Sequence, residues 1–250
     1  MRLYIVYKNQ EPDSKEELLH SRTNLSLIPY SEITKRRSDG YLYFSKGVLK
    51  FQLVSVPAMN SLFVSFEHLE RRVKDSLFQQ NLIKAVGIGR GRRPSILDGT
   101  AGLGSDAFLM ASTGTSVSLV ERNPIIYELL NDGLKRYKLN GSKESEISTK
   151  MHIEKRDFLE LKDLHCSFDA VYLDPMFPST KKSSLSKRPM YYLQKLLQKE
   201  ASEHDMFSVA QSIASKRVVV KRGIHSPNLA GHNADLVYRG NSSRFDVYLV

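Results

Sequence analysis

Residues 95–104, S-I-L-D-G-T-A-G-L-G, bring a carboxylate and several glycines to the end of a short apolar run. This order predicts a strand that ends at Asp98, a tight turn, and a helix for which Ser105 and Asp106 are candidate N-cap residues. The turn contains three glycines, Gly99, Gly102 and Gly104. Since glycine has no Cβ, its backbone reaches positive φ and allows a ligand to approach closely. We expect a ligand over this turn, at the carboxyl end of the strand.

The turn by itself leaves the identity of the ligand open. G-L-G-S-D-A also fits the G-x-G-x-x-G/A dinucleotide fingerprint. Glu121 ends the next expected strand, where an acidic residue can accept hydrogen bonds from ribose hydroxyls. These features favour a nucleoside-type ligand, and a purely structural turn is the alternative.

A second segment, residues 171–178 (V-Y-L-D-P-M-F-P), is also an apolar strand that ends in an acid, here Asp174. Pro175 and Pro178 donate no backbone hydrogen bonds, so the carbonyls of this loop stay available as acceptors. Phe177 beside them offers a stacking surface. A planar base with an exocyclic amine needs both, acceptors for its N–H groups and an aromatic surface for its ring.

The elements that must position these segments alternate between strand and helix from residue 95 onward. This alternation predicts an α/β fold with a mainly parallel sheet and helices on both faces. The expected strands are residues 95–98, 116–121, 151–155, 168–173, 217–221, 234–238 and 244–250. The expected helices are residues 105–112, 124–138, 190–199 and 206–215. The short R-G-N-S-S turn between the last two strands predicts a terminal antiparallel hairpin, which a simple six-stranded dinucleotide fold lacks.

Residues 1–66 are expected to form a small β-rich lobe. Its strands are predicted at residues 3–7, 41–45, 48–54 and 61–66, with a hairpin at Ser45-Lys46-Gly47. The basic stretch at 34–40 is either a contact for RNA phosphates or a solvated surface. Residues 67–94 are predicted as a linking helix, to about Val86, followed by a basic linker. The larger domain then covers residues 95–250.

Composition narrows the class of protein. The chain has 250 residues, with 37 Lys plus Arg against 27 Asp plus Glu, a formal charge of +10 that suits a polyanionic partner. The single cysteine, Cys166, excludes an intramolecular disulfide and fits a reducing cytosol. We expect a cytoplasmic protein with no membrane segment, because no long apolar run occurs. The histidines show no metal-ligand spacing, so no metal is expected.

The motifs resemble, in order, those of class I S-adenosylmethionine-dependent methyltransferases. They are residues 98–104, Glu121, Asp157 and residues 174–178. The D-P-M-F loop resembles the (D/N)-P-P-(Y/F) signature of enzymes that methylate exocyclic amino nitrogens, with Met176 in place of the second proline. D-x-T-A-G-L-G-x-D-A-F, L-V-E-R-N-P, Y-L-D-P-M-F-P and R-V-V-V-K-R together resemble a narrower family. It is the bacterial 16S rRNA guanine-N2 methyltransferase family of the RsmJ type, which acts near the 3′ end of small-subunit rRNA.

This resemblance runs from about Lys84 to the C-terminus and is much less clear in the N-terminal lobe. It implies a class I Rossmann-like domain with a seven-stranded sheet, S-adenosylmethionine as cofactor, and 16S rRNA or the small ribosomal subunit as partner. The residues that it implies for the cofactor pocket are Asp98, Gly102, Gly104, Ser105, Asp106, Glu121, Arg122, Asp157, Phe158 and Asp174. Glu121 would accept from both ribose hydroxyls, and Asp157 from the adenine amino group.

The implied reaction is the in-line transfer of a methyl group to guanine N2. Asp174 and the carbonyl of Pro175 would accept the two N–H groups, and Phe177 would stack on the flipped-out guanine. Basic residues at or near the carboxyl edge of the sheet are candidates for binding rRNA phosphates. They are Lys181, Lys182, Lys187, Arg188, Lys221 and Arg222.

Three alternatives stay open at this point. The chain could methylate an exocyclic amine in another RNA, in DNA or in protein. It could be an NAD(P)-dependent oxidoreductase, for which the D-P-M-F-P loop would have no use. It could also be an RNA-binding protein without catalytic activity.

Overall fold

The computed structural model describes residues 1–57, 60–70, 73, 77–140, 143–163, 167–175, 188–197 and 202–250. Its contacts divide the chain into two compact units. The N-terminal unit comprises residues 1–65, 123–136 and 178–198, and the larger unit comprises residues 66–122, 137–177 and 199–250. The division into a lobe (1–66), a linker (67–94) and a methyltransferase domain (95–250) stays a prediction.

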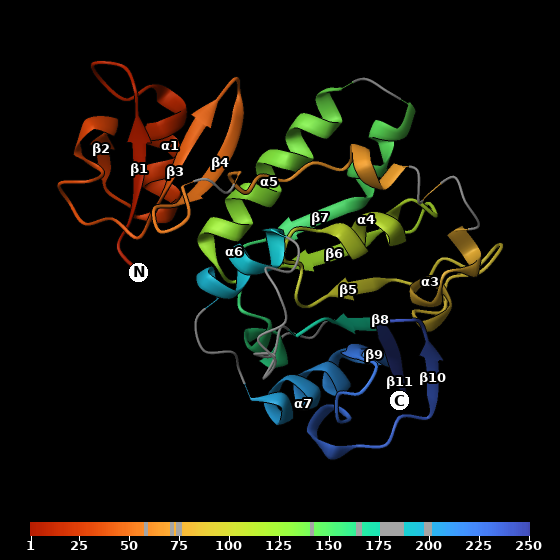
Figure 1. The fold of residues 1–250 in the computed structure, drawn as a ribbon. Helices are drawn as coiled ribbons and strands as arrows, with labels where there is room; N and C mark the ends of the chain where they lie inside the picture. The colour runs from red at the N-terminus through yellow and green to blue at the C-terminus, as the bar shows by residue number, and fades with distance from the viewer. Residues whose placement is uncertain are drawn as a thin grey trace. The chain divides into compact units, whose positions relative to one another are not determined.

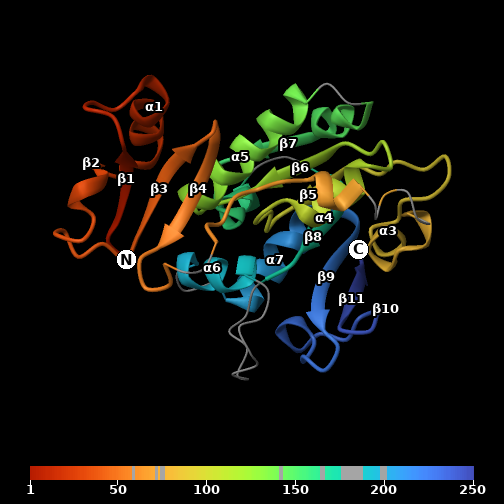
Figure 2. The same cartoon turned by 45° about the horizontal axis from the view of Figure 1, so that its top comes forward.

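The larger unit is built on a seven-stranded sheet in the order β10-β11-β9-β8-β5-β6-β7 (Figure 1). The strands are β5 (Ile96–Asp98), β6 (Val117–Val120), β7 (Met151–Glu154), β8 (Phe168–Leu173), β9 (Ala214–Gly223), β10 (Leu236–Arg239) and β11 (Ser243–Leu249). Strands β5 to β9 are parallel to one another, whereas β11 is antiparallel to both β9 and β10. Figure 2 shows β11 between these two strands. The expected seven strands and terminal hairpin are confirmed.

Helices cover the two faces of this sheet because alternate strand residues point to opposite sides. On one face, Leu97 and Val171 pack with Met206 and Phe207 of α7 (Glu203–Ile213). On the other face the Tyr172 hydroxyl reaches Asp106 on α4 (Ser105–Ala111). The apolar residues of both layers are buried, as expected for a mainly parallel sheet.

Helix α4 begins differently from the sequence expectation. Its N-cap is Gly104, in the left-handed region with φ 75°, and no side chain caps it. Ser105 is therefore the first helical residue, and the expected capping by Ser105 or Asp106 is wrong. The reason is the turn itself, which needs a residue without Cβ at the position where the helix starts.

The N-terminal unit contains a four-stranded sheet in the order β2-β1-β3-β4. Its strands are β1 (Leu3–Tyr7), β2 (Leu27–Pro29), β3 (Gly40–Ser45) and β4 (Val48–Leu53). The expected hairpin joins β3 and β4, and Lys46 and Gly47 both have positive φ, 51° and 75°. The sequence did not predict β2, which has only three residues and includes a proline.

The strand expected at residues 61–66 is wrong. Leu62 makes a single antiparallel bridge with Phe51, and no strand follows it. Two residues later the Val64 carbonyl accepts a hydrogen bond from the Arg136 guanidinium at 2.5 Å instead of from a neighbouring strand.

Three longer helices belong wholly or mainly to the N-terminal unit. They are α1 (Ser14–Thr23), α5 (Pro124–Leu139) and α6 (Arg188–Leu196). Helix α1 starts with a capping box formed by Asp13 and Glu16. Helix α5 starts as predicted, because the Asn123 side chain accepts from the N–H groups of Ile125 and Ile126 at 3.0 and 3.2 Å.

A continuous helix over residues 67–86 is not formed. The described residues of this segment include two 3-10 turns, η2 (Glu67–Leu69) and η3 (Leu77–Gln79), and the short α3 (Asn81–Ala85). Glu70 and Val73 between the two turns are helical. Gln80 has an extended backbone, with ψ 137°, and this interrupts the helical path before α3. No helix in the described part of the chain is long and apolar enough to cross a membrane.

Candidate active site

The candidate site lies at the carboxyl edge of the central parallel strands. Asp98 ends β5, and Asp174 directly follows β8. In the sheet, Asp98 is in register with Tyr172, and Leu173 is in register with Val220. Asp174 therefore lies beside the glycine turn on one side and beside the end of β9 on the other.

The glycine turn is held by hydrogen bonds to acidic side chains. The Thr100 N–H donates to the Asp98 carboxylate at 3.1 Å, and the Gly102 N–H donates to Glu121 Oε2 at 3.0 Å. Gly102 has φ 53°, in the left-handed region. Glu121 thus binds the turn through the same kind of donor contact that a ribose hydroxyl would offer it.

Gly99 serves packing rather than positive φ. A Cβ at this position would lie 2.6 Å from the Phe158 ring and 2.8 Å from Leu173. Phe158 begins the 3-10 helix η5 (Phe158–Asp163) and is buried. The expected place of Phe158 beside the turn therefore has a steric basis, since only glycine leaves room for the ring.

The second segment is tied to the glycine turn by one short hydrogen bond. The Asp174 N–H donates to the Thr100 hydroxyl at 2.6 Å. Pro175 follows and is buried. The rest of the loop lies outside the described residues, and four predicted site residues fall there. They are Phe177, Lys181, Lys182 and Lys187.

Three carboxyls and one ammonium form an acid–lysine cluster, made of Asp98, Asp106, Asp174 and Lys221. The Lys221 ammonium lies 2.7 Å from Asp106 and 2.9 Å from Asp174. The Tyr172 hydroxyl donates to the same Asp106 oxygen at 2.6 Å. The side chain of Asp174 keeps 36% of its surface exposed, so a ligand can reach it.

The cluster shifts the pKa values of its members. Burial raises the pKa of Asp98 to about 8, opposed by the Thr100 N–H and reinforced by the charges of Asp106 and Asp174. Partial desolvation of its carboxyl also raises the pKa of Asp174, and the Lys221 ammonium opposes that rise. Burial alone would lower the pKa of Lys221, but the two carboxylates outweigh it and keep this pKa above its usual range.

The acids expected at the ends of the next two strands also lie close to each other. Arg122, which follows Glu121, forms an ion pair with Asp157 at 3.5 Å. The Glu121 N–H donates to the Glu154 carbonyl at 3.1 Å, which joins the ends of β6 and β7. Asp157 in turn accepts the Leu159 N–H at 3.0 Å.

Two of the residues suggested for RNA contact are engaged inside the protein. Lys221 belongs to the acid–lysine cluster rather than to the surface. The Arg222 side chain is only 3% exposed, and it donates to Glu203 and to the Pro227 carbonyl. Arg188 is the first residue of α6, and its side chain is outside the description.

Sequence reasoning missed the roles of Thr100 and Tyr172. Thr100 links the two motifs, and Tyr172 orients Asp106. The signal for Thr100 was its place in the turn directly after Asp98-Gly99, where its hydroxyl faces the neighbouring strand end. Tyr172 gave no signal beyond alternation, since an apolar strand commonly includes a tyrosine.

The charge of the site fits a cationic nucleoside better than a dinucleotide. With a pKa of about 8, Asp98 is largely neutral at pH 7, so the Asp106 and Asp174 carboxylates exceed the Lys221 ammonium by one negative charge. The cluster therefore favours a positively charged ligand over a pyrophosphate. S-adenosylmethionine carries a sulfonium and an ammonium, and it has no phosphate. The described residues include no group of His, Cys, Asp and Glu side chains that could hold a metal ion.

Comparison with known proteins gives the family. A family model for SAM-dependent methyltransferases matches residues 28–250. A Coxiella burnetii protein named Ribosomal RNA small subunit methyltransferase J is 36% identical over 252 residues, covering 99% of this chain and 97% of the relative. The chain belongs to this methyltransferase family. The small subunit methyltransferase J of Dechloromonas aromatica is 40% identical over 188 residues, covering 74% of this chain and 76% of the relative.

A solved structure agrees with this assignment. The crystal structure of a SAM-dependent methyltransferase from Neisseria gonorrhoeae has a TM-score of 0.75 and 27% identity, and it covers 99% of this chain and 95% of that chain. As a member of the small subunit methyltransferase J family, the chain is an S-adenosylmethionine-dependent enzyme. The cofactor that the glycine turn left open is therefore S-adenosylmethionine.

Proposed function

We propose that this enzyme transfers a methyl group from S-adenosylmethionine to the exocyclic N2 of a guanine near the 3′ end of 16S rRNA. The family supports the rRNA substrate, since the relatives are named for the small-subunit RNA. The exocyclic amine rests on the D-P-M-F loop. The observation that carries this proposal is the position of Asp174, fixed by Thr100 and Lys221 beside the glycine turn.

Four residues would hold the nucleoside end of the cofactor. Glu121 would accept from the ribose hydroxyls and Asp157 from the adenine amino group, while Arg122 keeps Asp157 in place through their ion pair. Phe158 packs under Gly99 and would shape the floor beneath the adenosine.

The acidic end of the pocket would hold the methionyl end. Asp98 supports the turn through the Thr100 N–H, and Ser105 and Asp106 start the helix directly after Gly104. Gly102 and Gly104 leave the backbone of the turn without side chains. Carboxylates at this end suit the ammonium and sulfonium charges of the cofactor.

Bound S-adenosylmethionine supplies an electrophilic methyl group. The guanine amine is a weak nucleophile, because its lone pair is delocalised into the ring. Asp174 and the Pro175 carbonyl would accept its two N–H bonds, direct the lone pair to the methyl group, and stabilise the positive charge that develops on nitrogen. As the N–C bond forms, the C–S bond breaks and neutral S-adenosylhomocysteine leaves. The N–H becomes acidic in the same step, so the Asp174 carboxylate that accepts its hydrogen bond would suffice to take the proton.

Lys221 has a positioning role in this proposal. Its ammonium is held between Asp106 and Asp174 and favours the ionised form of Asp174, which accepts the amine hydrogen bond. Phe177 would stack on the guanine, and Lys181, Lys182, Lys187 and Arg188 would meet RNA phosphates.

The test measures methyl transfer with labelled S-adenosylmethionine, using small-subunit rRNA and 30S particles from cells that lack the gene. Digested nucleosides are read by mass spectrometry. We expect N2-methylguanosine with the wild-type enzyme and at least a hundredfold less with Asp174→Ala, a loss on the order of that for removing one positioned electrostatic group.

Asp169→Asn is the matched control, because Asp169 lies on the same strand at its opposite end and pairs with Lys216 and Ser95. It should methylate at the wild-type rate. Methylation of another nucleoside, of DNA or of protein would identify a different substrate and refute the guanine assignment. Full activity in Asp174→Ala would refute the proposed role of the loop.

A further inference from the structure

The N-terminal unit presents a group of tyrosines on one face of its sheet, here called the tyrosine face. Its members are Tyr4, Tyr30, Tyr41 and Tyr43. Tyr4 and Tyr41 are partners in register on β1 and β3, and Tyr43 is two residues further along β3 on the same side. Tyr30 follows β2, and its ring lies 6.2 Å from that of Tyr41. The group thus extends across three neighbouring strands.

A small apolar cluster packs against three of these rings. Val6, Ile28 and Ile33 are buried, and Tyr4, Tyr41 and Tyr43 pack against them. The rings are therefore held in place while part of each remains accessible, and Tyr30 is 52% exposed. Planar rings that are already fixed on a sheet lose little conformational entropy on binding, so they are suited to stacking with flat ligands.

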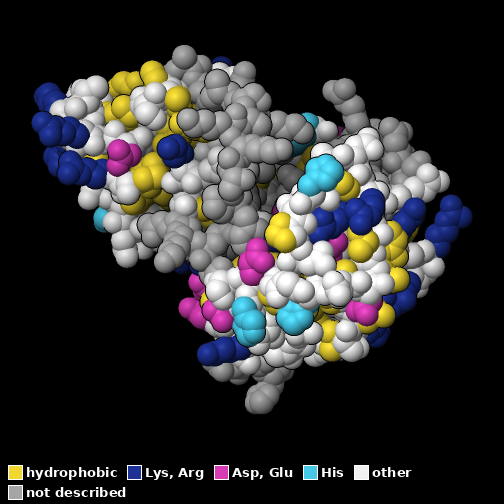
Figure 3. Space-filling model, turned by 60° about the horizontal axis from the view of Figure 1, so that its bottom comes forward, with side chains coloured by type: hydrophobic (Ala, Val, Ile, Leu, Met, Phe, Trp, Pro, Cys, Tyr) yellow, Lys and Arg dark blue, Asp and Glu magenta, His cyan; other side chains and the backbone are white. Residues whose placement is uncertain are grey.

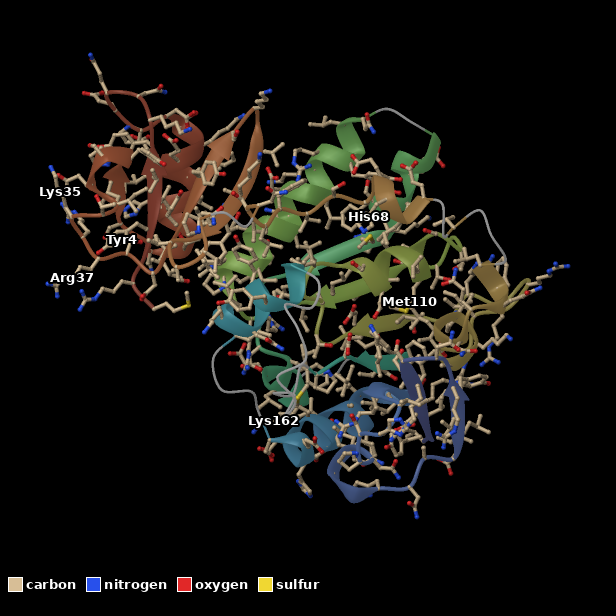
Figure 4. The ribbon with its side chains drawn as sticks, viewed as in Figure 1. Tyr4, Lys35, Arg37, His68, Met110 and Lys162 are labelled. Carbon is tan, nitrogen blue, oxygen red and sulfur yellow. The ribbon has the colours of Figure 1, made fainter. Side chains whose placement is uncertain are left out.

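Cations border the same face and form a basic rim, made of Lys8, Lys35, Arg36 and Arg37. The Lys8 ammonium lies 5.6 Å from the Tyr30 ring and 6.0 Å from the Tyr43 ring. Figure 4 shows Lys35 and Arg37 in the same part of the unit as Tyr4, and Figure 3 shows Lys and Arg side chains beside hydrophobic ones there.

The charge of this rim is largely available to a ligand. Its four members are exposed. Arg36 pairs with Glu32 at 2.9 Å, whereas no ion pair is found for Lys35 or Arg37 among the described residues. Accessible aromatic rings bordered by accessible cations match the two parts of a nucleotide, its base and its phosphate.

We propose that the tyrosine face and its basic rim bind a single-stranded segment of the rRNA substrate, with bases stacked on the tyrosines and phosphates on the rim. The assignment rests on the proposed function for the choice of RNA. Single strands are favoured over duplex, because the bases of a duplex are stacked on each other and cannot reach the rings. The formal charge of +10 on the whole chain agrees with a polyanionic ligand.

Fluorescence anisotropy with the full-length protein tests this proposal. The probe is a fluorescein-labelled single-stranded RNA of about twelve nucleotides, and the same sequence as a duplex is the comparison. We expect Tyr30→Leu to weaken single-strand binding by about fivefold or more, and Tyr30→Phe to bind as the wild type does. Because Tyr30 is more than half exposed, both variants should fold, which circular dichroism verifies.

The basic rim has its own readout. Removing two phosphate contacts with Lys35→Gln and Arg37→Gln together should lower the slope of log Kd against log salt by roughly 1.4. The matched control is Lys15→Gln with Lys46→Gln, two exposed cations of the same unit that lie on α1 and in the β3–β4 turn. A control pair that changes the slope as much as the rim pair would overturn the proposal. So would single-strand binding by Tyr30→Leu within twofold of the wild type.

The methyl-transfer assay separates this inference from the proposed function. If the wild type makes no N2-methylguanosine, the proposed function fails, and anisotropy still decides whether the face binds single strands. If the wild type is active and Tyr30→Leu has an unchanged KM for rRNA, only the proposal that the tyrosine face binds RNA is refuted. An increased KM with unchanged kcat supports the face.

Discussion

Lys221 links two carboxylates of the candidate site. It is the ammonium of the acid–lysine cluster, and it touches both Asp106 on α4 and Asp174 after β8. Its position shows why residue type alone was a poor guide, since a lysine at a strand end suggests contact with a phosphate. The register of β9 against β8 places it beside Asp174 instead.

Replacing Lys221 tests this positioning role. We expect Lys221→Met to lower methyl transfer by about 10- to 100-fold, because Asp174 loses the partner that fixes its carboxylate. Without the ammonium the pKa of Asp174 rises further, so the acid limb of the kcat/KM profile should move to higher pH. Lys216→Met, at the other end of the same strand, is the control. An unchanged pH profile in Lys221→Met would contradict the role.

Asp98 gives a prediction about stability. Its pKa is about 8 in the folded protein, above the value of about 4 for an unfolded chain, so folding binds a proton between these values. Its contribution to stability is complete below pH 4 and is lost as the pH rises through 8. Between about pH 5.5 and 7.5 the free energy of unfolding should fall by roughly 3 kcal/mol more in the wild type than in Asp98→Asn.

Urea unfolding at the two pH values measures this difference. Asp205→Asn, on the exposed start of α7, reports any general effect of removing an aspartate. Parallel pH dependence in wild type and Asp98→Asn would show that Asp98 is ionised throughout this range.

At the scale of elements, the sheet was predictable and several connections were not. Val171 and Leu173 of β8 lie in a continuous apolar run that ends at an acid. The apolar run predicts a buried strand, and the acid predicts the end of the strand at which the site lies. The strand at 61–66 looked equally apolar, but its backbone bonds to the Arg136 side chain, a tertiary contact that local pattern does not contain. Arg244 and Asp246 form a buried ion pair at 2.8 Å, which the strand pattern at 244–250 did not predict.

The candidate site divides in the same way. Asp98, Glu121, Asp157 and Asp174 follow directly from strand ends and glycine or proline neighbours. The hydrogen bond from Asp174 to Thr100 depends on the register between two strands 74 residues apart, so only the folded sheet reveals it.

Gly99 tests the packing between β5 and η5. We expect Gly99→Ala to lower the free energy of unfolding by about 1–3 kcal/mol, because its Cβ would overlap the Phe158 ring and Leu173. Gly89→Ala is the matched control, since its Cβ would meet only the Arg92 side chain at 3.9 Å. Thermal unfolding of both variants gives the comparison. Equal melting temperatures for Gly99→Ala and wild type would mean that Phe158 can move away without cost.

At the scale of the whole molecule, the chain has a formal charge of +10 and folds into two units that contain different functional features. The larger unit has the motifs of the methyltransferase, and the N-terminal unit has the tyrosine face and the basic rim. Because these features belong to different units, RNA binding and cofactor binding can be measured with separate variants.

Salt should separate these two activities. Affinity for 16S rRNA is expected to fall at least about tenfold between about 50 and about 200 mM salt, which requires only two or three phosphate contacts. Binding of S-adenosylhomocysteine, measured by calorimetry in the same buffers, should change less than twofold. A similar loss for both ligands would indicate that salt disturbs the fold rather than the phosphate contacts.

The excess of carboxyls in the acid–lysine cluster also bears on how the enzyme exchanges its cofactor after each turnover. The carboxylates of Asp106 and Asp174 outnumber the Lys221 ammonium, so they hold a ligand with a positively charged sulfur more firmly than a ligand whose sulfur is neutral. Methyl transfer removes that charge, so the reaction itself weakens the hold of the protein on the spent nucleoside. The ratio of the two dissociation constants measures this preference, and it should decrease in Asp106→Asn. Product release would then be driven by the electrostatics of the same aspartates that draw the fresh cofactor in.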